Sequence, residues 1–260
     1  MKLDYIEIGT SDFETIVEES NGFGISIEPL SIYLDKLPNK ENNIKLNVAI
    51  SDVEGFETVF YIHPDDITNY NLPNWLRGCN SIKNPHPSAV KVLNECGLSH
   101  LYKNEIIKVI TWDTLIRNYN ITYVDYLKLD TEGHDTVILK SILNSTTNIL
   151  PNKILFESNI LTNPEDIRDI VKRLKSRGYE IIEDYGDNIL VEYKSNLPTK
   201  IIFASNDSRY LKYWSDNSKL CSEILKITPV LLHITNEDSD FTWDEYGVIK
   251  KITVYNNFII

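Results

Sequence analysis

The sequence has little of what a disulfide framework, a zinc site or a membrane segment requires. Its 260 residues include three cysteines, which are scattered at Cys79, Cys96 and Cys221, so we expect reduced thiols in an intracellular protein. No apolar run is long enough to cross a bilayer. No signal peptide is visible, because the first strand-like run begins almost at Met1. These features predict a soluble, cytoplasmic chain.

Positive charge is also scarce. Lysine and arginine number 26 against 38 acidic residues, which gives a formal net charge of −12 and a pI near 4.9. An acidic surface repels phosphate, so we expect neither a nucleic acid nor an anionic membrane as a partner. A neutral or cationic small molecule fits this charge better. The length allows one large α/β domain or one domain with an appendage.

Glycine is missing where a dinucleotide would need it. Residues 5–8 predict a short strand that ends at Gly9, but residues 10–14 contain no glycine, so the G-x-G-x-x-G spacing for a pyrophosphate is absent. This disfavours NAD and FAD and leaves adenosine cofactors without a pyrophosphate. The next strand ends at Glu28, about twenty residues beyond the turn, where a carboxylate can accept both hydroxyls of a ribose. The alternative is that Gly9 only permits a positive φ and Glu28 is a solvated strand end.

A helix is predicted between these two strands. Ser11 and Glu14 have the spacing of a capping box, and the apolar residues around them recur on one helical face. That face would hold Phe13, Ile16 and Val17. Strands and helices therefore alternate, which is typical of a parallel sheet with right-handed crossovers.

A third strand is predicted at 44–50. Ligands lie outside the carboxyl ends of parallel strands, so residues 9–12, Glu28 and residues 49–52 should converge. Ala49 and Ile50 would then flank an adenine ring. The alternative is an ordinary strand end followed by a turn at 54–55.

Residues 63–104 follow a further extended run at 56–63 and show no sustained period. A structureless segment of this length is uncommon unless it covers a binding site, so we expect a lid that shapes a substrate pocket. The candidate pocket residues are Trp75, Arg77, Asn80, Ser81 and His86. The alternative is a packed surface loop with a buried Trp75.

Acidic and imidazole side chains cluster after a second buried strand, within VDYLKLDTEGHD at 124–135. Asp130, Glu132, His134 and Asp135 are difficult to explain as core residues. A parallel sheet would place this strand beside the first, and Asp130 near the cofactor. The alternative is that Glu132 and Asp135 favour the N-terminus of the next helix, an explanation that we prefer for Asp135 alone.

The remaining elements complete one sheet. A strand at 153–158 ends at Glu157, a helix follows with Asn163 as its cap and Gly178 as its end, and strands at 179–183 and 188–193 predict a hairpin. The predicted fold class is α/β: a Rossmann-like methyltransferase fold, with a mostly parallel twisted sheet that ends in an antiparallel hairpin and a C-terminal α/β extension.

Several stretches taken together resemble the FkbM family of S-adenosylmethionine-dependent methyltransferases. The matching stretches are EIGTSDF at 7–13, IEP at 27–29, NVAISDVEG at 47–55, TWDTLI at 111–116, VDYLKLDTEGHD at 124–135 and ILFES at 154–158. The resemblance implies transfer of a methyl group to a hydroxyl, commonly on a sugar or a natural product. One departure is that Thr10 and Ser11 stand where many members have glycine.

The resemblance also implies roles for individual residues. The cofactor site would comprise Glu7, Gly9, Thr10, Ser11, Asp12, Glu28, Pro29, Ala49, Ile50 and Asp130. The base that takes the hydroxyl proton would be Asp130, Glu132 or His134, and Glu157 would join the lid residues at the acceptor. The acids Asp130, Glu132 and Glu157 could hold magnesium, but no spacing requires a metal and none is assigned.

The tail differs from the rest of the chain. A linker at 195–198 separates a domain over 1–195 from residues 196–260, in which runs at 200–205, 228–234 and 248–255 predict strands and residues 210–220 a helix. We expect either the start of a second domain or an extension that packs on the first domain or at a dimer interface. Two other functions stay open: a nicotinamide-dependent oxidoreductase and a non-catalytic nucleoside-binding module.

Overall fold

The computed structural model describes residues 1–194, 202–205, 230–235 and 249–253. The chain divides into two compact units, residues 1–194 and 195–260. The second unit has a parallel sheet formed by β12 (Ile202–Ser205), β13 (Val230–Thr235) and β14 (Ile249–Thr253). These strands lie where the apolar runs of the tail predict them, whereas the predicted helix at 210–220 lies outside the described residues.

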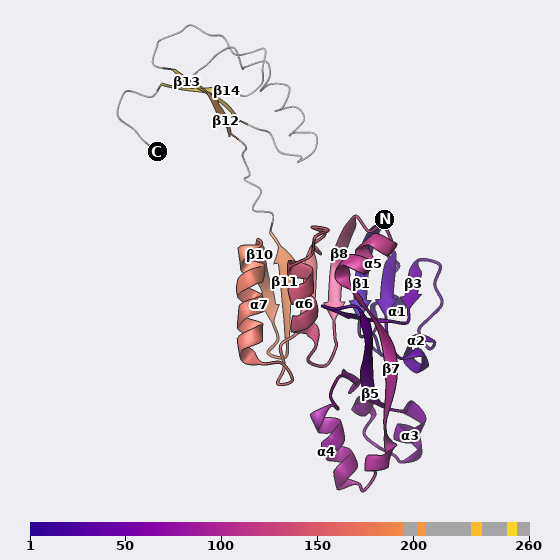
Figure 1. The fold of residues 1–260 in the computed structure, drawn as a ribbon. Helices are drawn as coiled ribbons and strands as arrows, with labels where there is room; N and C mark the ends of the chain where they lie inside the picture. The colour runs from indigo at the N-terminus through magenta and orange to yellow at the C-terminus, as the bar shows by residue number, and fades with distance from the viewer. Residues whose placement is uncertain (195–201, 206–229, 236–248, 254–260) are drawn as a thin grey trace. The chain divides into compact units, whose positions relative to one another are not determined.

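The larger unit is built on a seven-stranded sheet with the order β10-β11-β9-β8-β1-β2-β3 (Figure 1). Five neighbouring strands are parallel: β9 (Lys153–Glu157), β8 (Tyr123–Leu129), β1 (Lys2–Ile8), β2 (Gly24–Ile27) and β3 (Asn43–Leu46). The antiparallel strands β11 (Asn188–Tyr193) and β10 (Tyr179–Asp184) form a hairpin at one edge. The predicted Rossmann-like sheet is confirmed, including the position of β8 beside β1.

Three helices belong to the main core of this unit: α5 (Trp112–Asn118), α6 (Asp135–Leu143) and α7 (Pro164–Ser176). The Thr111 hydroxyl accepts the N–H of Thr114 at 3.2 Å, and the Asn163 side chain accepts that of Glu165 at 2.8 Å. Such caps satisfy donors that have no partner inside the helix, which is why the helices begin at these residues, and the cap at Asn163 lies where the sequence predicts it. Within the described part of the chain, no helix combines the length and the apolar character that a membrane crossing requires.

The helix predicted from Ser11 and Glu14 is wrong. The only helix there is the short α1 (Ile16–Glu19), and Ser11 and Glu14 have φ values of 48° and 54°. The left-handed region is closed to an α-helix of L-residues, so the chain turns twice before α1 begins. The carboxylate of Glu7 accepts the Ile16 N–H at 2.9 Å, which places the N-terminal partner of α1 on β1 rather than in the loop.

The prediction of one strand at 44–50 is also wrong. In the middle of this stretch the chain leaves the first sheet, so the stretch is divided into two strands. The Asn47 side chain donates to the carbonyls of Glu28 at 3.1 Å and Pro29 at 2.8 Å, which holds the break between β3 and β4 (Ala49–Ser51). β4 pairs with β7 (Tyr102–Thr111) in a second sheet. A short helix, α2 (Ser31–Leu34), precedes this exchange.

The second sheet is part of an inserted region, residues 49–111. Its order is β4-β7-β5-β6, with β5 (Gly55–Ile62) and β6 (Ser81–Ile82) antiparallel to their neighbours. Figure 1 shows β5 and β7 running from the first sheet towards α3 (Pro64–Asn69) and α4 (Pro87–Glu95). Two 3-10 turns, η1 (Asn74–Arg77) and η2 (Ser99–Leu101), complete the region.

The prediction that 63–104 is irregular is therefore wrong. The segment has a hydrophobic core of its own, formed by Ile62, Ile67, Leu76, Cys79, Ala89, Leu93 and Leu101. Its elements are too short for a helical period to be visible in the sequence. The alternative of a buried Trp75 is wrong as well, because 49% of this side chain is exposed.

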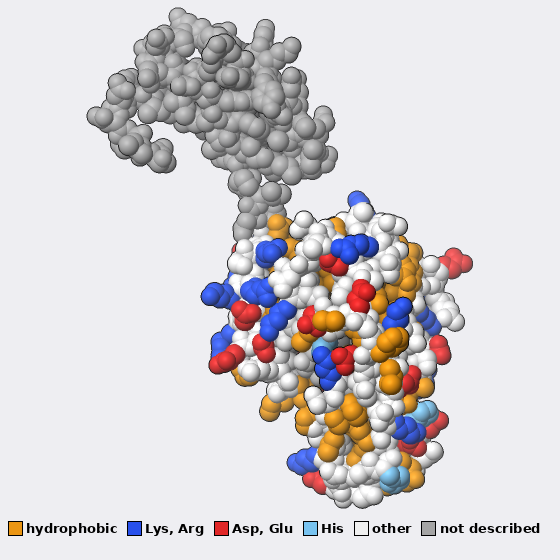
Figure 2. Space-filling model, in the orientation of Figure 1, with side chains coloured by type: hydrophobic (Ala, Val, Ile, Leu, Met, Phe, Trp, Pro, Cys, Tyr) orange, Lys and Arg blue, Asp and Glu red, His pale blue; other side chains and the backbone are white. Residues whose placement is uncertain are grey.

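The surface of the inserted region differs from that of the seven-stranded part. Charged side chains are spread over the latter in Figure 2, whereas hydrophobic side chains gather over the inserted region. Phe56 on β5 and Ile106 on β7 are 74% and 71% exposed. The apolar face of β5 and β7 is thus left open on one side.

Candidate active site

Loops from both sheets meet at the carboxyl ends of β1, β2 and β8. They enclose a first cavity of about 240 Å³. Its lining residues are Ile8, Gly9, Thr10, Ser11, Phe13, Glu28, Pro29, Ala49, Ile50, Val59, Trp75, Gly78, Asn80, Ile82, Asp130, Thr131 and Glu132. This is the edge of a parallel sheet at which ligands bind, and the predicted convergence of residues near 9, 28, 49 and 130 is present.

Gly9 permits the closest approach in this cavity. Its φ is 83°, and a Cβ built on it would lie 1.9 Å from the carbonyl oxygen of Asp130. No side chain fits into that space, so the turns after β1 and β8 pass each other only because residue 9 is glycine. The neighbouring residues, Thr10 and Ser11, carry side chains in the same turn. Ser11 does so even though its φ is also positive, at 48°.

Glu28 is an anchor for the loop after β1. Its carboxylate accepts the Ser11 N–H at 3.0 Å and the Leu30 N–H at 2.9 Å, and the residue is 3% exposed. The alternative of a solvated strand end is therefore wrong. Burial raises the pKa of Glu28 to about 7. Each carboxylate oxygen has further lone pairs, so both can also accept a ligand hydroxyl.

Two other acids predicted for the cofactor site do not line the cavity. Glu7 is fully buried and pairs with Lys128 at 3.0 Å. Asp12 pairs with Lys36 at 3.1 Å and with Arg77. The Ser11 hydroxyl also donates to the Arg77 carbonyl at 3.3 Å, so the loop after β1 is tied to η1 of the inserted region.

The loop after β8 carries the acids of the DTEGHD stretch. Asp130 lines the first cavity, and burial raises its pKa to about 6. Glu132 has a φ of 51°, and its N–H donates to Glu157 at 3.1 Å. Burial and the neighbouring acids raise the pKa of Glu157 to about 9. Glu157 lines neither cavity of this site.

Asp135 holds this loop together. Its carboxylate accepts the N–H of Thr131 at 3.0 Å and that of Glu157 at 2.8 Å, and the residue is fully buried. Asp135 also lies in the first turn of α6, where its charge favours the helix N-terminus as predicted. The two N–H groups that it binds belong to the loop and to β9, so Asp135 sets the position of the acids around it.

A second cavity, of about 300 Å³, lies on the other side of Glu132. It is lined by Ser81, Ile82, Asn84, Pro85, His86, Pro87, Glu132, Gly133, His134, Ile160 and Leu161. His134 contacts the Ser51 hydroxyl at 2.9 Å through Nε2, and burial lowers the pKa of His134. Among the residues that the structure describes, only Glu132 and Ile82 line both cavities.

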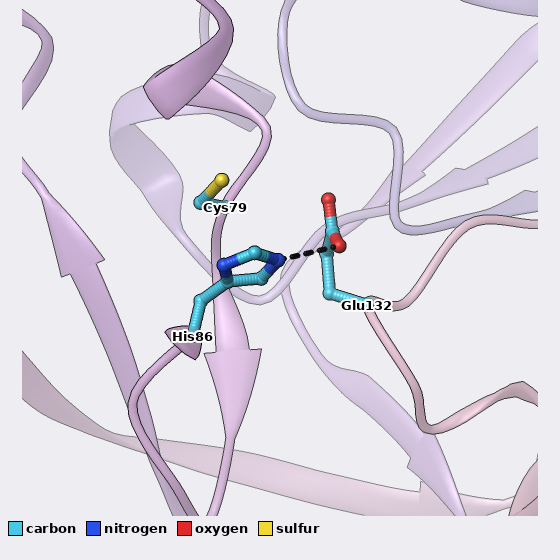
Figure 3. Close-up of side chains that lie close together, drawn as sticks. All are labelled: Cys79, His86 and Glu132. Atoms are coloured by element: carbon cyan, nitrogen blue, oxygen red, sulfur yellow. Dashed lines mark ion pairs between the residues drawn. The ribbon is translucent and has the colours of Figure 1, made fainter. Parts of the chain in front are cut away.

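The predicted substrate residues are divided between the two cavities. Trp75 and Asn80 line the first, and Ser81 and His86 line the second. The Arg77 side chain is held by Asp12 and lines neither. His86 Nε2 lies 3.2 Å from a carboxylate oxygen of Glu132, which Figure 3 shows with the nearby Cys79.

Sequence reasoning missed several lining residues. Val59 and Ile82 come from β5 and β6, where nothing in the local sequence marks them. The helical pattern predicts Phe13 on a core face, but Phe13 lines the first cavity and is 39% exposed. Thr131 could have been found, because it stands between two acids at the end of a buried strand.

A comparison with protein families accounts for this arrangement. A model of the methyltransferase FkbM domain matches residues 7–181, which include the whole second sheet, strands β2, β3, β8 and β9 of the first sheet, and every residue that lines the two cavities. Searches of curated proteins and of solved structures returned no match. The family match covers more than half of the 260 residues. The chain belongs to the FkbM family of methyltransferases.

Proposed function

We propose that this chain is an S-adenosylmethionine-dependent O-methyltransferase, with the donor in the first cavity and the acceptor hydroxyl in the second. The observation that carries the proposal is the position of Glu132. Within the described part of the chain, it is the one ionisable side chain that lines both cavities. A group that takes a proton from the acceptor while the methyl group is transferred must reach both reactants.

The first cavity suits the donor. Glu28 offers carboxylate oxygens at the end of β2 for the ribose, and Ala49 and Ile50 offer an apolar wall for adenine. Asp130 and Glu132 add negative charge to the wall of the same cavity. Bound S-adenosylmethionine would supply an activated methyl group on a cationic sulfonium, and these carboxylates would attract that charge.

Glu132 is preferred as the base over the other two candidates. Asp130 lines only the first cavity, and His134 lines only the second, where its ring contacts Ser51. The acceptor oxygen would take the methyl group, the carbon–sulfur bond would break, and the hydroxyl proton would pass to Glu132. Alignment of the oxygen with the methyl group would supply much of the rate.

The second cavity suits a neutral or cationic hydroxyl compound, such as a sugar or a small metabolite. Its wall combines the polar side chains of Ser81, Asn84 and His134 with the apolar ones of Ile160 and Leu161. Such a mixture can bind hydroxyls on one side of a ring and carbon on the other. A net charge of −12 disfavours an anionic acceptor.

Ligand-dependent thermal stability tests the donor. A ligand that binds only the native state raises the melting temperature. S-adenosylmethionine and S-adenosylhomocysteine should both do so, and NAD should not. Stabilisation by NAD alone would contradict the proposal and favour an oxidoreductase.

The acceptor is tested separately by incubation with a library of sugars and hydroxylated metabolites, read as the gain of one methyl mass. Transfer to a hydroxyl supports the proposal. Donor binding without transfer to any acceptor would instead indicate a binding module.

A further inference from the structure

We propose that His86 is a positioning residue that holds the Glu132 carboxylate at the boundary between the two cavities. This inference rests on the proposed function, in which Glu132 is the base. It adds a role for the inserted region: the base comes from the loop after β8, and the group that orients it comes from the start of α4. The residues are far apart in sequence and meet only in the folded chain.

The contact is buried. His86 Nε2 lies 3.2 Å from Glu132 Oε2, and the side chains are 7% and 16% exposed (Figure 3). Water therefore has little access to the pair, and a hydrogen bond to a charged acceptor is strong under these conditions. The ring nitrogen faces Oε2, and among the described residues no donor is bonded to Oε1, which is left for an acceptor hydroxyl.

The protonation of the ring follows from its other nitrogen. His86 precedes α4, and its Nδ1 accepts the N–H of Ser88 at 3.2 Å and that of Ala89 at 3.4 Å. A neutral imidazole has one donor and one acceptor, so a ring whose Nδ1 accepts carries its proton on Nε2. Nε2 then donates to Glu132. The N-terminus of α4 thus sets the tautomer that Glu132 requires.

The same observation argues against a metal ion at this position. Cys79 Sγ, the His86 ring and the Glu132 carboxylate lie within 4.8 Å of one another, as three metal ligands would. A metal would need the lone pair of Nε2, which is occupied by the proton. Burial also raises the pKa of Cys79 to about 12, so the thiolate that a metal binds is disfavoured. The thiol contacts the Trp75 carbonyl at 3.9 Å.

The backbone of Glu132 is constrained as well. Its φ of 51° belongs to a region that residues other than glycine seldom adopt, and its N–H is held by Glu157 at 3.1 Å. With the backbone held in this way, the remaining freedom is rotation of the side chain. The bond from His86 restricts that rotation and keeps the carboxylate between the cavities.

His63 supplies a matched control. It also precedes a proline and caps a helix, since its Nδ1 accepts the N–H of Asp65 at 3.2 Å at the start of α3. Its ring contacts Asp65 and not Glu132. His63→Leu therefore removes the same kind of cap from the same region without touching the pair, whereas His86→Leu removes both the cap and the bond.

The kinetic test compares three variants. His86→Leu should lower kcat by about tenfold to a hundredfold, the range that misplacement of a catalytic group produces, with the KM of the donor unchanged. His86→Gln, whose amide can donate to Glu132, should restore most of kcat. His63→Leu should leave kcat unchanged. Equal losses in His86→Leu and His63→Leu, or a loss confined to KM, would overturn the positioning role.

A second measurement does not depend on activity. The ¹⁵N chemical shifts of His86 should show a protonated Nε2 and a bare Nδ1, and added Zn²⁺ should leave them unchanged. The opposite tautomer, or a Zn²⁺ shift that is lost in Cys79→Ser, would overturn the inference. Absence of methyl transfer in the unmodified protein would instead count against the proposed function, while the tautomer still tests the His86–Glu132 bond.

Discussion

The two regions that meet at the site are built in different ways. The seven-stranded sheet supplies its lining residues from contiguous stretches, at 9–11 and 130–132, directly after β1 and β8. The inserted region supplies Trp75, Asn80 and His86 from separate short elements. Parallel strands gather their following loops at one edge by topology, whereas the inserted region must bring its residues there by packing. The part of the site that the seven-stranded sheet supplies is therefore recognisable as sequence motifs, and the part that the inserted region supplies is not.

The largest effect is expected where the two regions share one side chain. Glu132→Gln keeps the size of the side chain but removes the proton acceptor, so kcat should fall by about 10²-fold to 10⁴-fold. Donor binding, read as the thermal shift, should remain. Glu105→Gln on the exposed part of β7 is the control and should be fully active. Unchanged turnover in Glu132→Gln would remove Glu132 from the base role.

A pair of glycines compares the packing of the two regions. Gly9 and Gly97 have φ values of 83° and 69°, but a Cβ at Gly97 would meet nothing within 4 Å, whereas a Cβ at Gly9 would overlap the Asp130 carbonyl. Gly97→Ala should lower the free energy of unfolding by about 1 kcal/mol, and Gly9→Ala by about 3 kcal/mol. Urea denaturation measures both. Equal losses would mean that the close approach at Gly9 relaxes without cost.

Glu28, the buried acid after β2, should make the free energy of unfolding depend on pH. Burial raises the pKa of Glu28 from 4.5 to about 7, so between these values the native state holds a proton that the unfolded chain has released. The free energy of unfolding should fall as pH rises through this window, by about 1 to 3 kcal/mol from this group.

The side chain of the Glu28→Gln variant cannot ionise. Between pH 4.5 and about 7, the urea midpoint of this variant should therefore decrease less than that of the unmodified protein. The slope is the quantity to compare, because the amide also weakens the bonds to Ser11 and Leu30 at every pH. Glu105→Gln should keep the slope of the unmodified protein. Parallel curves for the unmodified protein and Glu28→Gln would contradict the buried, protonated state.

The smallest effect is expected from the ion pair that connects the seven-stranded part to the inserted region. Asp12 of the sheet loop pairs with Arg77 of η1, and the Arg77 side chain is 25% exposed. A double-mutant cycle with Asp12→Asn and Arg77→Met should give a coupling free energy of about 1 kcal/mol, because water screens the exposed part of the pair and Lys36 remains as a partner. A coupling of zero would mean that packing alone holds η1 against the loop.

Predictions of secondary structure from the sequence are wrong where contacts between distant residues outweigh the local sequence pattern. Ser11 and Glu14 have capping-box spacing, yet both adopt a positive φ because the loop after β1 must reach Glu28 and η1. The run at 44–50 looks like one strand, yet the bonds from Asn47 divide it between two sheets. The alternating pattern of a strand does not specify which sheet the strand joins.

The sequence by itself determined the parallel sheet, its closing hairpin, the Asn163 cap of α7 and the glycine turn beside an acid-rich loop. These depend on periodicity, capping and turn chemistry, which act over a few residues. Only the tertiary structure decided that Glu132 lines two cavities and that Asp135, in the first turn of α6, also binds the loop after β8 and the end of β9. It also decided that His86 Nε2 lies 3.2 Å from a carboxylate oxygen of Glu132, since that contact joins the start of an inserted helix to the loop after a central strand. Such contacts follow from how two sheets pack together, and no local stretch of sequence contains that information.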